Sequence, residues 1–204
     1  MANGSVQITA DYHDYTPPFA VEPIVQRMLK SIPEKYLDGL GEVVLTNPSG
    51  KSRKRRRAMT KSRNHKVRAL DARGLYHPAW HNQPAWIEIF VDNTLKHWEK
   101  SWWLKLSFIR EAEIGDVLFH EIGHHIHFTS QPEYKEREDV ADIWKVRLER
   151  NYHRNRRPFL RVISLPFRPL MRAFSRKEEQ RMFHEHMISR AEFEERKNRS
   201  RNPL

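Results

Sequence analysis

The residues best suited to chemistry stand near the middle of the chain, as His120-Glu121-Ile122-Gly123-His124, an HExxH pattern. Two histidines four residues apart on a helix share one face, with Cβ atoms about 5–6 Å apart. Their imidazoles can bind one zinc ion at about 2.0–2.1 Å each. Glu121 is displaced around the helix, so it can take a proton from a metal-bound water without being a ligand. The pattern therefore predicts a metal centre with a general base.

A third ligand is expected downstream, because a catalytic zinc site keeps three protein ligands and one open position. Glu138 and Asp142 stand four residues apart in the next segment of helical pattern. A turn at 129–132 would fold this helix back, so that Glu138 completes a His₂Glu site and Asp142 orients a ligand histidine. Ala141 between them is small, which favours close approach of the two helices. Asp142 is the rival third ligand, and the alternative interpretation is a polar surface helix with solvated charges.

At these residues the chain resembles the gluzincin metallopeptidases, whose pattern is HExxH with a downstream ExxxD; here the two parts read HEIGHH and EREDVAD. The 13 residues between His124 and Glu138 make it similar to the small single-domain kinds, the minigluzincins and the ImmA/IrrE-like peptidases. Ser130 stands where a metzincin needs its third His, which excludes that class. The resemblance covers about residues 20–150 and implies one zinc ion, peptide-bond hydrolysis and a zincin-like domain.

The resemblance also implies a place for the substrate and a group for the oxyanion. In this family the strand before the active-site helix pairs with extended peptide. Tyr134, Tyr152 and His153 are candidates for the oxyanion group, without support from spacing. The residues in the position of the substrate strand are Trp86, Ile87, Glu88 and Ile89.

The elements that must position these residues follow from hydrophobic periodicity. Apolar residues at helical spacing predict a helix from Glu113 to about Phe128 and another from Glu133 to about Tyr152. Further elements are a short helix at Glu22–Ser31, a short strand at Val43–Leu45 and the clearest strand, Trp86–Val91. These elements predict an α+β fold: a short mixed or antiparallel sheet packed on the HExxH helix and the Glu-bearing helix.

The remaining segments are assigned more coarsely. Residues 1–20 are expected to be an extended N-terminal segment, followed by a zincin-like domain at 21–153. A second strand is expected within 67–76, and the tryptophan-rich stretch 95–106 is expected to be helical and to cover the core. Residues 154–204 form a basic C-terminal extension with a helix at about 175–196, which begins with a Ser-x-x-Glu capping pattern.

The net charge of +11 is concentrated in two segments, 51–68 and 143–204, each of which carries a net +10. The first is expected to be a solvated loop, because it holds too few apolar residues to bury. It is either a disordered insertion or a contact for nucleic acid or another polyanion. The residues proposed for that contact are Arg53, Lys54, Arg55, Arg56 and Arg57.

Other features exclude whole classes of protein. The absence of cysteine excludes disulfide scaffolds, iron–sulfur clusters and thiol catalysis. No apolar run approaches the roughly 18 residues that a membrane span needs. The first 30 residues hold no apolar core of a signal peptide, so we expect a cytoplasmic protein, and we expect a monomer.

Two functions remain open at this point. The first is a zinc-dependent endopeptidase that hydrolyses peptide bonds through metal-activated water. The second is a polyanion- or DNA-binding protein whose zinc site is structural or vestigial. The first rests on the five spaced residues of the metal centre, and the second on the two basic segments.

Overall fold

The structure is a computed structural model, and the chain divides into two compact units, 1–155 and 156–204. All described residues except Arg156 belong to the first unit. For residues 50, 59–62 and 65–67 the backbone alone is described. The described ranges are 6–50, 59–62, 65–68, 71–98, 101–130 and 138–156.

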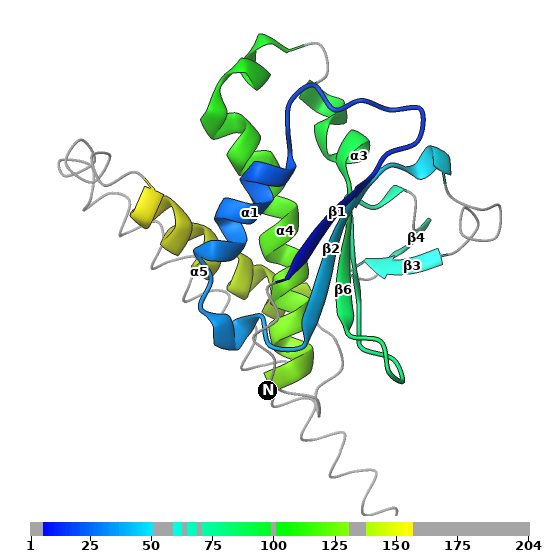
Figure 1. Cartoon of the computed structure of the whole chain (residues 1–204), viewed down its shortest axis with the longest axis vertical. Helices are drawn as coiled ribbons and strands as arrows, with labels where there is room; N and C mark the ends of the chain where they lie inside the picture. The colour runs from blue at the N-terminus through cyan, green and yellow to red at the C-terminus, as the bar shows by residue number, and fades with distance from the viewer. Residues whose placement is uncertain are drawn as a thin grey trace, which may run out of the picture. The chain divides into compact units, whose positions relative to one another are not determined.

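Four strands form a mixed sheet in the order β1-β2-β6-β5 (Figure 1). The strands β1 (Gln7–Asp11), β2 (Leu40–Thr46) and β6 (Ala85–Phe90) run parallel to one another. The strand β5 (Gly74–His77) pairs antiparallel with β6 and takes the edge of the sheet. The predicted α+β class with a small mixed sheet is therefore confirmed.

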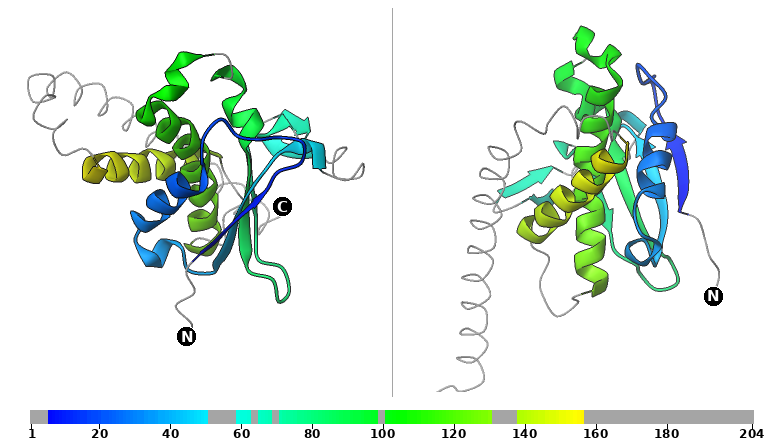
Figure 2. Two further views of the ribbon diagram at one scale, coloured as in Figure 1. Left: turned by 45° about the horizontal axis from the view of Figure 1, so that its top comes forward. Right: turned by 90° about the vertical axis from the view of Figure 1, so that its left-hand side faces the viewer.

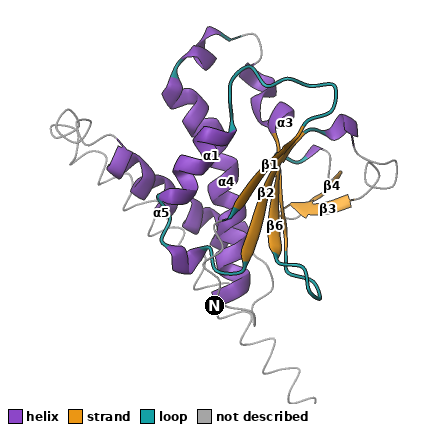
Figure 3. Cartoon of the chain, in the orientation of Figure 1, coloured by secondary structure: helices purple, strands orange, loops and turns teal. Residues whose placement is uncertain are grey.

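Four α-helices accompany this sheet within the described residues (Figures 2 and 3): α1 (Glu22–Lys30), α3 (Val91–Leu95), α4 (Ser107–Ser130) and α5 (Glu138–Arg156). Pro23 fits the first turn of α1, where its missing N–H has no helical partner to lose. Glu22 in the first turn and Lys30 in the last complement the helix dipole. The short helix predicted at Glu22–Ser31 is confirmed.

The core lies between one face of the sheet and the helices α1 and α4. Residues of β2 and β6 point alternately to the two faces, and the inward set is fully buried. It packs against apolar side chains of α1 and α4 to form one continuous cluster. The central members are Val43, Leu45, Ile87, Ile89, Val25, Met28, Ile114, Leu118 and Ile122.

The long helix α4 begins at Ser107, six residues before the predicted start at Glu113. Ile109 packs against the core, so the apolar face continues upstream of the segment in which the period is strongest. Arg110 also donates hydrogen bonds to the carbonyl oxygens of Leu104 and Lys105, which fixes the chain at the entry to the helix. The strand predicted at Trp86–Val91 ends at Phe90, because Val91 already opens α3.

The prediction of a loop over 51–68 is wrong for its second half. The strands β3 (Met59–Ser62) and β4 (His65–Arg68) pair antiparallel and form a separate two-stranded sheet. Antiparallel pairing satisfies backbone N–H and C=O groups whatever the side chains are, so a basic composition does not prevent it. Residues 51–58 lie outside the described residues.

The tryptophan-rich stretch is not a regular helix, contrary to the prediction. It holds two short 3₁₀ turns, η4 (Lys96–Trp98) and η5 (Trp102–Lys105). Trp98 packs against the core as expected. Trp102 and Trp103 are 59 % and 43 % exposed and stack on each other with ring centroids 4.2 Å apart, so they do not cover the core.

The two ends of the chain give different outcomes. The N-terminal segment is extended, as predicted, but its residues 7–11 form the edge strand β1, so it is part of the sheet. The helix predicted at 175–196 lies outside the described residues. Among the described helices, none is long and apolar enough to span a membrane.

Candidate metal centre

The helices α4 and α5 bring three side chains of the predicted site together. The Nε2 atoms of His120 and His124 are 3.1 Å apart. Glu138 Oε2 lies 3.2 Å from the first of these atoms and 3.9 Å from the second. Within the described residues, His120, His124 and Glu138 are the group of three that could hold a metal ion.

The spacing of these atoms fits zinc. Four ligands at about 2.0–2.1 Å in a tetrahedron lie about 3.3 Å from one another. The three measured separations, 3.1, 3.2 and 3.9 Å, are close to this value. Two imidazole nitrogens and one carboxylate oxygen are also the donor set of catalytic zinc sites of the His₂Glu kind.

Asp142 contacts the other side of the His120 ring. Its Oδ1 lies 3.0 Å from His120 Nδ1, one helical turn beyond Glu138. Burial lowers the pKa of His120, but hydrogen bonds to Asp142 and Glu138 and the charge of Glu121 outweigh burial and raise it to about 10. Asp142 therefore occupies the position of a carboxylate that fixes the tautomer of a ligand histidine, and Glu138 the position of the ligand.

His124 differs sharply from its neighbour in protonation. Burial and the charge of His120 lower the pKa of His124 to about 4. In the metal-free protein near neutral pH, His120 is thus an imidazolium and His124 a neutral imidazole. A metal ion at this position requires both rings neutral, so its binding must release a proton from His120.

Close backbone approach between the two helices makes this arrangement possible. A Cβ on Gly123 would lie 2.5 Å from the carbonyl oxygen of Ala141 and 2.8 Å from its Cα. No ordinary residue fits at such distances, and the obstructing atoms are backbone that cannot rotate away. The HExxH pattern thus contains, as Gly123, the residue that lets α5 bring Glu138 and Asp142 to the histidines.

Glu121 points from α4 toward the sheet and is 6 % exposed. The edge strand β5 passes over it at Gly74, where a Cβ would lie 2.7 Å from Glu121 Oε1 and 2.6 Å from Val117 Cγ1. The carboxylate therefore lies next to His120 in the sequence and under the edge strand β5. This is the position that a base for a substrate on that edge would need.

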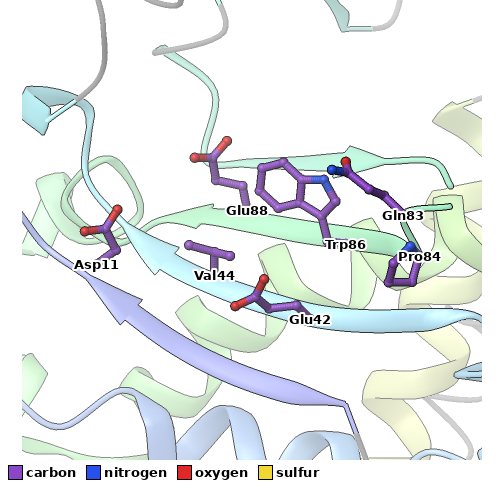
Figure 4. A pocket seen from close by; sticks show the side chains of 7 residues that line it. All are labelled: Asp11, Glu42, Val44, Gln83, Pro84, Trp86 and Glu88. Atoms are coloured by element: carbon purple, nitrogen blue, oxygen red, sulfur yellow. The ribbon is translucent and has the colours of Figure 1, made fainter. Parts of the chain in front are cut away.

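The prediction that peptide pairs with residues 86–89 is wrong. The strand β6 is bonded to β2 on one side and to β5 on the other, so neither edge is open. Ile87 and Ile89 are buried in the core. Trp86 and Glu88 point to the opposite face of the sheet, where they line a cavity of about 420 Å³ with Asp11, Glu42, Val44, Gln83 and Pro84 (Figure 4). A strand was predicted within 67–76, and β5 overlaps the end of this range. Its place at the edge of the sheet follows from its hairpin pairing with β6 across residues 78–84, which local sequence pattern does not predict.

The sequence did not predict a hydrogen-bonded pair, Tyr76 and His125, on the sheet side of α4. The Tyr76 hydroxyl lies 3.2 Å from His125 Nδ1, and His125 Nε2 lies 3.0 Å from the carbonyl oxygen of Asp38. Because the carbonyl can only accept, Nε2 donates and Nδ1 accepts from the tyrosine. Burial lowers the pKa of His125, which keeps the ring neutral as this chain of hydrogen bonds requires.

A second missed group lies one helical turn before His120. Asp116 accepts hydrogen bonds from Arg73 Nη1 at 2.8 Å and from Lys145 Nζ at 2.7 Å. Arg73 also bonds Glu113 at 2.9 Å. We name Asp116, Arg73 and Lys145 the Asp116 cluster; it joins the chain just before β5 to α4 and α5. Asp116 stands one helical turn before His120 in the sequence, but no local pattern predicts that Arg73 and Lys145 bind it.

The remaining predicted residues have different outcomes. Tyr152 is buried and packs on Phe119, and His153 is exposed on α5. Tyr134 lies outside the described residues, as do the proposed polyanion contacts Arg53–Arg57.

Comparisons with family models, with curated proteins and with solved structures found no match for this chain. The resemblance to the gluzincins therefore rests on the residues of this chain, HEIGHH and EREDVAD.

Proposed function

We propose that the protein is a zinc-dependent endopeptidase of the gluzincin kind. The observation that carries the proposal is one constellation: three zinc-type ligand atoms within 4.8 Å of one another, with Asp142 behind His120 and Glu121 under the sheet edge. A zinc ion held by these residues would supply a Lewis acid able to lower the pKa of water to about 7 and to polarise a carbonyl.

The residues of the chain take distinct roles in this proposal. His120, His124 and Glu138 hold the ion, and Asp142 accepts a hydrogen bond from His120 Nδ1. Glu121 takes a proton from the attacking water and gives it to the leaving amine. Asp142 keeps the His120 ring oriented while this happens.

The edge strand β5 takes the substrate role that the sequence assigned to residues 86–89. Within the described part of the chain, no strand pairs with the outer edge of β5. An extended peptide can add there through main-chain hydrogen bonds. The scissile bond would then lie beside Gly74, where the lack of a side chain lets the backbone of β5 pack directly against Glu121.

The test compares metal content and activity in matched variants. Full-length wild type, His120→Ala and Glu121→Gln are assayed for zinc by mass spectrometry and for cleavage of denatured casein, with Glu34→Gln on the exposed turn at 34–36 as the control. We expect one zinc per chain in all but His120→Ala. Glu121→Gln should keep zinc and lose about 10²–10⁴-fold in rate.

Two results contradict the proposal. One is zinc-bound wild type that cleaves no peptide bond, which would favour a structural or vestigial site. The other is Glu121→Gln with undiminished activity and bound zinc, which would deny the base its role.

A further inference from the structure

The surface of α4 beside the metal ligands ends in an exposed aromatic residue. Phe128 stands one turn after His124, and its side chain is 48 % exposed although the two preceding residues are buried. At about 100° per residue, it points about 40° round the helix from His124 and about 20° short of Glu121. It therefore lies over the same side of α4 as the metal ligands and the base.

A second aromatic ring reaches the same place from the sheet. Tyr76 of β5 has its ring centroid 6.3 Å from that of Phe128, at an interplanar angle of 58°. Its hydroxyl is fixed by the chain of hydrogen bonds through His125 to the carbonyl oxygen of Asp38. The C-terminal end of α4 and the turn between β5 and β6 lie at the same end of the sheet (Figures 1 and 2). Two rings from two separate elements thus form one apolar surface.

The other end of this surface has the opposite chemistry. One turn before His120, Asp116 binds Arg73 and Lys145, and these three side chains are charged and partly exposed. A peptide crossing the metal centre along β5 would therefore meet aromatic rings on one side of the scissile bond and ion pairs on the other.

The direction of β5 decides which part of a substrate meets the rings. The strand runs from Gly74, above Glu121, to Tyr76, beside Phe128. Antiparallel pairing is the more stable kind, and a peptide so paired has its amino-terminal side at Tyr76. Two residues of β-strand span about 7 Å, so the rings lie one or two positions before the scissile bond.

We propose that Tyr76 and Phe128 form a specificity site for a large apolar side chain, at one of the two residues before the scissile bond. This inference rests on the proposed peptidase function. Both residues select the substrate; neither takes part in proton transfer or metal binding.

The first experiment maps cleavage sites in denatured casein by mass spectrometry for zinc-loaded wild type, Phe128→Ala and Trp102→Ala. Trp102 is a matched control, since it is also an exposed aromatic but belongs to η5. We expect Phe, Tyr, Leu or Met within the two positions before the cleaved bond for wild type and Trp102→Ala. Phe128→Ala should lose this preference by about tenfold or more in kcat/KM, with unchanged zinc content.

A second experiment measures binding without turnover. Full-length Glu121→Gln, alone and combined with Phe128→Ala, is titrated with two fluorescein-labelled alanine hexapeptides that carry one phenylalanine or one serine. We expect the phenylalanine peptide to bind about tenfold tighter, and Phe128→Ala to abolish the difference.

The outcomes separate the two proposals. Cleavage without an apolar preference, or the same preference in Phe128→Ala, overturns the specificity site and leaves the peptidase standing. If wild type cleaves nothing but the binding difference depends on Phe128, the peptidase fails and the apolar site stands. Equal binding of both peptides overturns the site in either case.

Discussion

The candidate metal centre and the Asp116 cluster both use residues of α4 and α5, one helical turn apart. They differ in the cations that face their carboxylates. In the Asp116 cluster a carboxylate meets two cations, the guanidinium of Arg73 and the ammonium of Lys145. In the metal centre two carboxylates, Glu138 and Asp142, face two imidazoles. Arg and Lys side chains pair with a carboxylate as cations. A neutral imidazole can instead bind either a proton or a metal ion at its ring nitrogen.

The physical lesson is that cation type separates a structural cluster from a site for chemistry. Burial lowers the pKa of Lys145, but its hydrogen bond to Asp116 outweighs burial and raises this pKa, which favours the charged form. The charge on His120 depends on pH and would be displaced by a bound metal ion. Four predictions test this difference, from the largest expected effect to the smallest.

Glu138→Ala should lower zinc affinity by more than the roughly 10–100-fold that loss of an outer partner costs, because it removes a ligand. Asp116→Ala should leave zinc affinity within about threefold, since the partners of Asp116 among the described residues are Arg73 and Lys145. Competition titration with a zinc-sensitive chelator measures both. Equal losses in the two variants would show that the clusters are not distinct.

Zinc should stabilise the wild-type fold, because the ligands converge only in the folded state. At zinc concentrations 100 times the dissociation constant the gain is about 2.7 kcal/mol. For a domain of this size that corresponds to about 5–11 °C in Tm. Differential scanning calorimetry with and without zinc measures the shift, and Glu138→Ala should show none under the same conditions.

Zinc affinity should rise about tenfold per pH unit between pH 6 and 8, because binding expels one proton from His120, whose pKa of about 10 lies above this range. In the metal-free protein, fold stability changes with pH in the opposite direction to zinc affinity. Protonated His120 stabilises the fold fully below about pH 6.5, and the gain is lost as pH rises toward 10. Calorimetric titration in buffers of different ionisation enthalpy counts the proton, and a flat affinity profile would contradict this account.

Asp116→Asn should cost the least, about 0.2–1 kcal/mol for each of its two ion pairs, because the partners are partly exposed. Urea unfolding of the zinc-free proteins in low and high salt measures this cost. The difference from wild type should shrink in high salt, where exposed charges are screened. A loss that salt does not change would mean that Asp116 acts through packing.

Much of the candidate site follows from local spacing. His120 and His124 share a face because four residues span about one turn of a helix, and Glu138 and Asp142 do so for the same reason. The small residues Gly123 and Ala141 allow the two helices to approach so closely that a Cβ on Gly123 would lie 2.5 Å from the carbonyl oxygen of Ala141. The strands around Val43 and Ile87 were visible as β-branched runs, and their burial confirms them as core.

What local spacing could not give was the partner of each element. The sequence assigned the substrate edge to residues 86–89, but the antiparallel hairpin places β5 outside β6 and moves the edge to Gly74–His77. Residues 51–68 were predicted to be a loop because they hold few apolar side chains, whereas β3 and β4 pair through their backbones.

The sequence by itself determined the side chains of the candidate metal centre: two imidazoles and two carboxylates at helical spacing, with Glu121 beside His120. Helix geometry repeats within a few residues, so such a pattern is complete in a short stretch of chain. Only the tertiary structure decided which strand covers Glu121, which cations hold Asp116, and that Tyr76 meets Phe128. Those contacts join residues 29 or more positions apart, and the order of strands and helices in space sets them.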